Sequence, residues 1–409
     1  MSKLGHLGRG LQEGSLYGLL FCLPFSIALI EVMFGLLVIG WVLERIDPST
    51  RAQTLWRAPQ LRWVALSLLA YLAVCLASVA VSYDAGKSFH GFMGKWFQYG
   101  LLFCIVTDVG ARPGVAAHCL RALSWSALLV LIEAMSQGLL GKGLLRHYPL
   151  FTYGRITGPY QNPSDLGTYL MVVIPAIGTY ASLQHKRLFR NCWYGMTALL
   201  VGCLTRTLTR GAWMGVGAGL CGLILLYSIG ALWRYAAAWL GAMIPLAGVG
   251  LPWSGWSDVV FRSSDIGKVD RLFMWQSAIH MIKDRPILGH GVNTFMGKYL
   301  DYWVGGERMP RYAHNCYLQI AAETGLIGLV VFAVFVGQLF LRLGDALRRL
   351  RAEQRVILCG LVVGVIAFLV QAAVDTNFYA VRQRALFWVI AGLALGVAES
   401  YSKAELSTK

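Results

Sequence analysis

Two arginines, Arg206 and Arg210, lie in the only polar cluster of an apolar run that extends over 39 residues, 192–230. As one helix this run would be about 58 Å long at 1.5 Å per residue. The apolar core of a bilayer is roughly 30 Å thick. The run must therefore fold back, and we expect both arginines at the tip of a helical hairpin at one membrane face.

These arginines suit an anionic substrate. The guanidinium group binds phosphate oxygens in a bidentate manner. Arg210 opens a helix at Gly211, where free N–H groups and the helix dipole favour an anion. The alternative is that both arginines only anchor the hairpin among lipid headgroups.

His314 and Asn315 are candidates for proton transfer at the start of a later helix. A helix N-terminus disfavours imidazolium, so it helps to keep the histidine neutral and able to accept a proton. Histidine is the usual general base near neutral pH. Asn315 could orient a hydroxyl or a carbonyl group. The alternative is a structural histidine in a loop.

Arg271 follows Asp270, a plausible N-cap, in a segment that Pro286 and Gly289 end. Its apolar spacing predicts an amphipathic helix that lies over the membrane spans, with a buried face formed by Leu272, Trp275, Ile279 and Ile282. Arg271 would point from the start of this helix, unless it is a solvated charge. We interpret His280 and His290 as packing or surface histidines.

Arg155 lies in a turn-rich loop, 154–165, before another span. We expect Ser164 or Asp165 to cap that span's helix. Capping explains most of this loop and leaves Arg155 without a role.

The elements that must position these residues are membrane helices. The chain has 409 residues, of which 57% are hydrophobic and 14% charged, whereas soluble domains are roughly a quarter charged. We predict an all-α integral membrane protein with about twelve transmembrane helices. They are 14–30, 31–43, 61–82, 96–107, 114–137, 165–183, 191–205, 211–229, 231–251, 316–341, 356–375 and 385–399. One tilted helix could replace the first two, but Pro24 and Glu31 favour two short ones.

Charge sets the orientation of these helices. The termini and the short loops on their side hold eighteen Lys and Arg, against nine in the short loops of the other side. The positive-inside rule then places both termini in the cytoplasm. We expect helices in 1–250, a periplasmic loop with amphipathic helices in 251–316, and helices with a short tail in 317–409.

The outer face is nonetheless basic, because the long loop adds eight Lys and Arg. We interpret this as a match to an anionic substrate; loose topology control is the alternative. The net charge of +16 is spread over both faces, which indicates membrane topology and no nucleic-acid partner.

Motifs for nucleotide and metal binding are absent from the sequence. We find no Walker loop, no His/Glu pair at helical spacing and no paired cysteines that read as a zinc site or a disulfide framework. We therefore expect no cofactor. Chemistry without ATP or metal must draw its driving force from the substrate, and a lipid-linked sugar pyrophosphate carries a good leaving group.

Together these segments resemble the O-antigen ligase and polymerase superfamily. The resemblance covers about 155–328 and rests on Gly158–Pro163, Thr209–Trp213, Arg271 with Trp275, Asp284–Gly291, His314-Asn315, Leu318-Gln319 and Glu323–Gly328. Each motif is loose, and their combination in one order is fairly specific.

The resemblance implies a metal-independent glycosyltransferase of the GT-C type in the bacterial inner membrane. Such an enzyme moves glycan from undecaprenyl pyrophosphate to an acceptor, lipid A–core in the ligase branch, on the periplasmic side. It implies that Arg210 and Arg271 hold the pyrophosphate, with Arg206 and Arg155 as supporting contacts, and that His314 activates the acceptor hydroxyl. One base without a carboxylate nucleophile suits a single inverting displacement.

Other functions fit parts of the sequence. A polymerase or a protein O-oligosaccharyltransferase would use the same donor. The short tail after the last expected span favours a ligase over the latter. A transporter or flippase of lipid-linked glycans would also have about twelve spans, but we find no inverted repeat.

Overall fold

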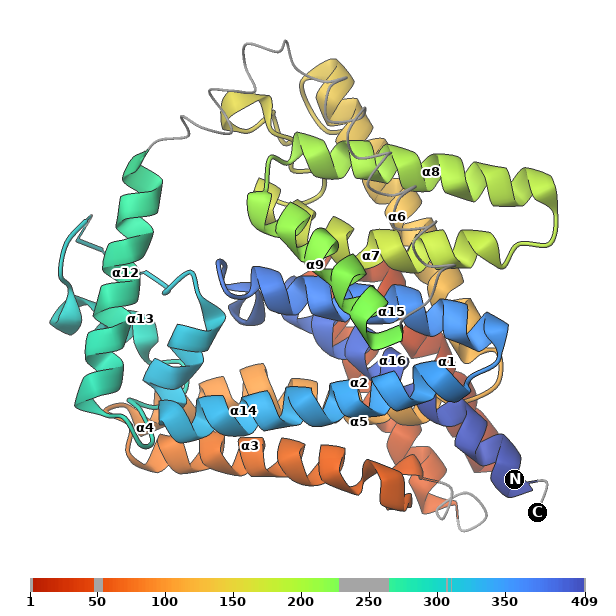
Figure 1. The fold of residues 1–409 in the computed structure, drawn as a ribbon, viewed down its shortest axis with the longest axis horizontal. Helices are drawn as coiled ribbons and strands as arrows, with labels where there is room; N and C mark the ends of the chain where they lie inside the picture. Colours follow the sequence, from red (N-terminus) through yellow and green to blue (C-terminus); the bar gives the residue numbers. More distant parts are fainter. Residues whose placement is uncertain (1–2, 48–53, 228–264, 307, 310, 408–409) are drawn as a thin grey trace.

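The computed structural model describes residues 3–47, 54–227, 265–306, 308–309 and 311–407. The described part is almost entirely helical (Figure 1). Its elements are α1 (Lys3–Cys22), α2 (Ile27–Ile46), η1 (Leu55–Arg57), η2 (Pro59–Leu61), α3 (Arg62–Ala80), α4 (Ala85–Gly91), η3 (Phe92–Phe97), α5 (Gln98–Gly110), α6 (Val115–Leu140), η4 (Thr152–Gly154), α7 (Pro163–Ser182), α8 (Arg187–Arg206), α9 (Arg210–Tyr227), α12 (Asp265–Asp284), α13 (Phe295–Lys298), η5 (Tyr299–Tyr302), α14 (Cys316–Arg349), α15 (Ala352–Gln371), η6 (Asn377–Tyr379) and α16 (Val381–Ser407).

The chain is a multi-pass membrane protein. Within the described ranges, 6 helical segments are long and apolar enough to cross a bilayer: Ile27–Ile46, Pro59–Ala80, Val115–Leu140, Cys316–Arg349, Ala352–Gln371 and Val381–Ser400. α1, α5, α7, α8 and α9 lie where further spans were expected but do not meet that criterion. The expected span 231–251 lies outside the described residues, so the number twelve stays a prediction.

The first two expected spans are two helices, but their bounds were wrong. α1 ends at Cys22 and α2 begins at Ile27, with Ser26 as the N-cap whose hydroxyl accepts from Leu29 N at 3.3 Å. Pro24 lies in the connection because proline cannot continue the first helix. The predicted break at Glu31 was wrong, since Glu31 lies inside α2. α1 begins near the N-terminus, and α16 likewise continues past the predicted end at Glu399.

The helix that was expected around Arg271 is present as α12, but two predictions about it were wrong. It begins at Asp265, so Asp270 lies within the helix and is not its N-cap. Among its side chains from Asp270 onward, those of Met274, Ser277, Ala278 and Met281 are buried, whereas Leu272 and Ile279 are exposed. The packing partners decide this outcome: Met274, Ala278 and Met281 pack with Phe295, Tyr299, Ala313 and Ala322.

Two further helix boundaries bear on the site. Asn162 caps α7, and its side chain accepts from Ser164 N at 2.9 Å; the expected cap at Ser164 or Asp165 was wrong, because Pro163 takes the first helical position. α14 is interrupted at Gly325, where φ is 73° and ψ is 177°. A Cβ there would collide with the Ile287 carbonyl. A short first segment therefore precedes the apolar part of α14.

The core lies around α16, α15 and α7. α16 packs on α5 and α15, and α15 packs on α7 and α9. A Cβ at Gly215 or Gly219 would lie 2.7 Å from the carbonyl of Ala367 or Val363 on α15. Small residues at this spacing let two membrane helices approach closely. The approach fixes α9, and with it Arg210, against the end of α15.

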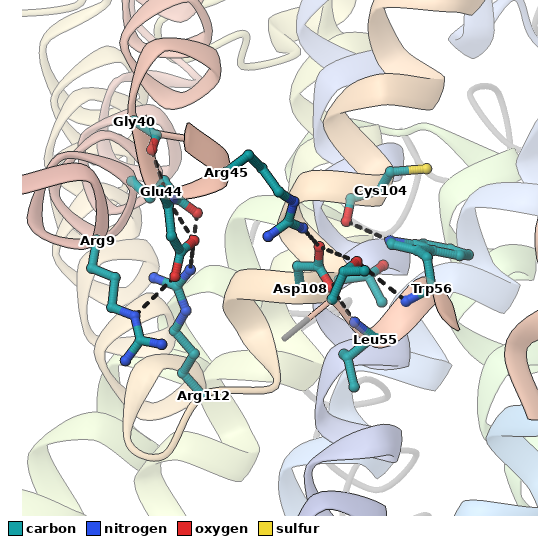
Figure 2. Close-up of polar contacts among 12 residues, drawn as sticks. Arg9, Gly40, Glu44, Arg45, Leu55, Trp56, Cys104, Asp108 and Arg112 are labelled. Carbon is teal, nitrogen blue, oxygen red and sulfur yellow. Dashed lines mark hydrogen bonds and ion pairs between the residues drawn. The ribbon is translucent and has the colours of Figure 1, made fainter. Parts of the chain in front are cut away.

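Buried ion pairs join α1, α2, α5 and the turn that follows α5 (Figure 2). The Glu44 carboxylate is 4% exposed and accepts from Arg9 Nε at 2.8 Å and from Arg112 Nη2 at 2.8 Å. Asp108 pairs with Arg45 and accepts from Leu55 N at 2.8 Å. Several donors satisfy each buried carboxylate, so hydrogen bonds offset the cost of burying its charge.

Candidate active site

The tip between α8 and α9 gathers three of the predicted arginines. α8 ends at Arg206 and α9 begins at Arg210, which confirms the predicted hairpin. Between them, Leu208 has φ 51°, a left-handed conformation that keeps the turn tight. Arg155 Nε donates to Thr207 O at 2.7 Å, and Ile156 N donates to Arg206 O at 3.4 Å. The structure thus gives Arg155 the position that sequence alone did not explain.

This tip also packs on the start of α7. Thr209 Oγ1 donates to Pro163 O at 3.3 Å, and a Cβ at Gly167 would lie 2.9 Å from Thr209 Cβ. Arg206 and Arg210 are both half-buried. The turn is therefore held from two sides while its arginines keep a path to solvent.

His314 lies immediately before α14, as predicted, and it faces Asp375. Its Nδ1 lies 3.6 Å from Asp375 Oδ1, and 38% of its side chain is exposed. The φ of His314 is 46°, a strained conformation for a residue with a side chain and one that is enriched at functional sites. The exposure leaves room for an acceptor to reach the ring.

Asn315 caps α14. Its Oδ1 accepts from Tyr317 N at 3.0 Å and from Leu318 N at 3.1 Å. The amide oxygen is thus occupied by the helix end, and only the amide nitrogen is left to orient a hydroxyl or a carbonyl. By capping α14, Asn315 fixes the backbone next to His314.

The end of α15 joins His314 to the arginine tip. Cys316 N donates to Ala372 O at 2.8 Å, and Tyr317 OH donates to Leu369 O at 2.6 Å. On the other side of this helix end, a Cβ at Gly211 would lie 3.0 Å from Val374 Cγ2. Arg210 and His314 thus both border the segment that carries Asp375.

Asp375, Arg382 and Asp165 were missed as site residues. Asp165 lies within electrostatic reach of both Asp375 and Arg382. The guanidinium of Arg382 lies 5.3 Å from the centroid of the Tyr160 ring, and its Nη1 donates to Pro159 O at 3.5 Å. For Asp375 and Arg382, the signal in the sequence was the polar stretch 375–384 between two apolar spans. Asp165 had been interpreted only as a possible helix cap.

Arg271 is not part of this cluster. It is exposed on α12, which packs on α14 and η5. Its neighbour Asp270 pairs with Arg311 at 3.2 Å. In Figure 1, α12 stands at the edge of the molecule, apart from α9. The structure therefore brings Arg155, Arg206 and Arg210 together and keeps the helix of Arg271 away from them.

A buried polar network centred on Glu323 lies in the first segment of α14, which follows His314. The Glu323 carboxylate, 1% exposed, accepts from Asn293 N at 2.9 Å and from Tyr379 OH at 3.1 Å. The Lys95 ammonium lies 4.8 Å from the Tyr379 ring and 5.6 Å from the Tyr312 ring. Glu323 thereby ties the loop after α12 to η6 and α14.

His290 is a packing residue, as the sequence predicted. His290 is 2% exposed, and its Nε2 lies 3.0 Å from Met281 O. Its backbone N donates to Ala322 O at 3.0 Å. His280, by contrast, is exposed on α12.

The fold and the site define a multi-pass membrane protein with an arginine tip beside a histidine–carboxylate pair. Residues 195–333, which include Arg206, Arg210, Arg271 and His314, match a family model described as O-antigen ligase. This match confirms the resemblance that the sequence motifs predicted. Arg155, Asp375 and Arg382 lie outside the matched segment.

Curated relatives agree with this family. Proteins named "Putative polysaccharide ligase" are 38% identical over 77 residues in Rickettsia conorii, 36% over 75 residues in Rickettsia typhi and 34% over 86 residues in Rickettsia bellii. The matches cover 16%, 16% and 18% of this chain. They span 18%, 18% and 20% of the relatives' own lengths, about a fifth in each case.

Proposed function

We propose that this protein is an O-antigen ligase. It transfers a glycan from undecaprenyl pyrophosphate to a sugar hydroxyl of lipid A–core at the periplasmic face of the bacterial inner membrane. The observation that carries the proposal is the convergence of the arginine tip and the His314–Asp375 pair on one end of α15. The family match of residues 195–333 supports the same reaction class.

His314 acts as the general base in this proposal. Asp375 faces Nδ1, so it favours the proton there and leaves Nε2 to accept the proton of the acceptor hydroxyl. The hydroxyl oxygen attacks the anomeric carbon, and the bond between that carbon and the pyrophosphate oxygen breaks. A single displacement of this kind inverts the anomeric centre.

The arginine tip stabilises the leaving group. Negative charge develops on the pyrophosphate as the glycosidic bond breaks, and preorganised cations near that charge lower the barrier. Arg210 and Arg206 supply bidentate donors, while Arg155 braces the turn through Thr207 and adds its own charge. Arg271 can add a donor contact only if the donor extends from α9 to α12 or if the two helices approach.

Reconstitution tests the proposal against its rivals. Purified protein in liposomes would receive undecaprenyl-pyrophosphate-linked glycan and lipopolysaccharide that ends at the core. A ligase attaches the glycan to the core; a polymerase lengthens the donor glycan without using the core. Transfer of the donor across the bilayer without a new glycosidic bond would indicate a transporter and would refute the proposal, as would polymerisation alone.

A further inference from the structure

Four exposed leucines lie where α6 ends. Leu139 and Leu140 close the helix and are 77% and 64% exposed, and Leu144 and Leu145 follow in the loop at 52% and 60%. α6 is long and apolar enough to cross a membrane, and its exposed Met135 lies one turn before Leu139. In Figure 1 this end of α6 lies at the edge of the molecule, beyond α8. The leucines therefore continue the exposed apolar face of a membrane helix past its last turn.

The loop that carries these leucines folds back on itself. Gly143 N donates to Tyr148 O at 3.0 Å, and Leu150 N donates to Gly141 O at 3.2 Å. We call residues 139–151 the leucine loop. Its two halves are thus held together by their own backbone, while the leucines face outward.

Two polar side chains of α6 satisfy further backbone groups of the leucine loop from the inside. The Glu133 carboxylate is 0% exposed and accepts from Leu145 N at 2.7 Å and from Arg146 N at 2.9 Å. The Gln137 amide is also 0% exposed and donates to Pro149 O at 2.7 Å. A loop in water can leave such groups to the solvent, whereas a segment in lipid needs partners for them within the protein. The leucine loop is therefore built as a segment that lipid surrounds.

The charges around the leucine loop suit a phospholipid surface. Residues 134–164 contain no Asp or Glu but three Lys and Arg, namely Lys142, Arg146 and Arg155. Tyr153 is 70% exposed in the same segment, and tyrosine is enriched where a membrane meets water. Basic side chains can reach lipid phosphates while their apolar neighbours enter the acyl chains. Charge and apolar surface together therefore fit a membrane leaflet.

The leucine loop is joined to the arginine tip. Arg155 lies four residues after its end, and the guanidinium is 5.9 Å from the centroid of the Phe151 ring. The Nε of Arg155 donates to Thr207 O at 2.7 Å, and Ile156 N donates to Arg206 O at 3.4 Å. The depth of the leucine loop in a membrane would therefore set the depth of the turn between α8 and α9.

We propose that the leucine loop inserts into the membrane leaflet nearest the arginine tip and anchors that tip at the level of the lipid phosphates. An acidic protein partner would match the charges of the loop. Such a partner would not require a backbone satisfied from within, nor an apolar face continuous with that of α6. Insertion of the leucine loop does not depend on the proposed function, because it needs only the fold and a phospholipid bilayer.

Spin labels test the insertion directly. Leu144→Cys would carry a nitroxide in the full-length protein, in liposomes of phosphatidylethanolamine and phosphatidylglycerol. The exposed Cys192 and Cys221 would be changed to serine, and the signal of that background protein would be subtracted. We expect oxygen to relax the label more than a water-soluble nickel chelate does, as at Val330→Cys, 60% exposed on the membrane-crossing α14. Glu353→Cys, exposed in the first turn of α15, is the control in water. A label at position 144 that responds to nickel as this control does would overturn the proposal.

A pair of substitutions tests the anchoring of the arginine tip. Leu145→Glu places a carboxylate among acyl chains, which is costly, so a label at Leu144→Cys should become accessible to nickel. In the transfer assay, Leu145→Glu should raise the donor KM about tenfold, because the displaced tip no longer meets the pyrophosphate. Leu145→Phe is the matched control, since it keeps the side chain apolar, and both its label and its donor KM should resemble those of the wild type. A displaced loop with an unchanged donor KM would refute the anchoring.

The label at Leu144→Cys alone remains decisive if Leu145→Glu fails to fold. The two proposals also fail separately, because the label is measured without a glycan donor. An inserted loop in a protein without glycan transfer would refute the transferase and retain the anchor. Transfer by a protein whose leucine loop lies in water would refute the anchor alone.

Discussion

His314 Nδ1 and Asp375 Oδ1 face each other at 3.6 Å, one just before the start of α14 and the other just after the end of α15. This distance exceeds that of a hydrogen bond, and the buried Nδ1 has no hydrogen-bond partner among the residues that the structure describes. The pair sits between two fixed backbone contacts, Cys316 N to Ala372 O and Tyr317 OH to Leu369 O. A small closure would convert it into the charge-assisted bond that an imidazolium needs.

Asp375→Asn should slow glycan transfer without loss of the fold. Asparagine keeps the shape of the side chain but cannot stabilise the imidazolium that forms when His314 takes a proton. We expect kcat to fall about tenfold or more, which corresponds to about 1.4 kcal/mol of barrier. The measurement is kcat with saturating donor and acceptor. Asp345→Asn, at an ion pair with Arg349 near the other end of α14, should leave kcat unchanged; an equal loss in both variants would refute the role of Asp375.

Substitutions of Arg210 should act on the donor. Hydrogen bonds to charged groups contribute about 1.5–3 kcal/mol, so Arg210→Ala should weaken donor binding roughly 10- to 100-fold. Arg210→Lys should recover only part of this loss, since lysine keeps the charge but not the bidentate geometry. Direct binding of undecaprenyl pyrophosphate measures the effect, with Arg349→Lys as the control. Unchanged donor affinity with lost turnover would contradict a phosphate-binding role.

Protein stability should depend on pH through His290. Burial lowers the pKa of His290 below its ordinary value, with smaller effects from neighbouring groups. The folded state thus favours the neutral ring of His290. The contribution of this ring to the stability of the protein is complete above the unfolded pKa of about 6.5, and it is lost as pH falls through the lower folded pKa. We expect the melting temperature to drop less on acidification in His290→Gln than in the wild type. His280→Gln, at an exposed position, should behave as the wild type does, and an identical acid response of all three proteins would refute the assignment.

Local sequence patterns predicted the helices and turns of the site better than they predicted which residues of those helices contact each other. The length of the apolar run 192–230 placed Arg206 and Arg210 at a hairpin, because bilayer thickness limits a helix whatever surrounds it. The buried face of α12 was predicted wrongly, since Leu272 and Ile279 have the right spacing but Met274 and Met281 meet the partners. Periodicity identifies an apolar stripe and does not reveal which stripe the neighbouring chain covers.

Long-range pairs were beyond such patterns. Asp375 belongs to a segment that sequence reasoning treated as the end of a span, and only the packing of α14 on α15 brings it to His314. Arg155 acquired a role only when Thr207 proved to be its partner. The separation of α12 from α9 was equally hidden, because no local signal sets the distance between two helices that a long segment connects (Figure 1).

The central claim is that His314 takes the proton of the acceptor hydroxyl, and one paired measurement tests it most directly. Wild type and His314→Ala would be reconstituted side by side, and donor binding and the rate of a single round of glycan transfer to core lipopolysaccharide would be measured in the same samples. We predict that donor affinity is retained and that transfer falls about 10²- to 10⁴-fold, the usual contribution of a general base. Transfer by His314→Ala at the wild-type rate would contradict the account.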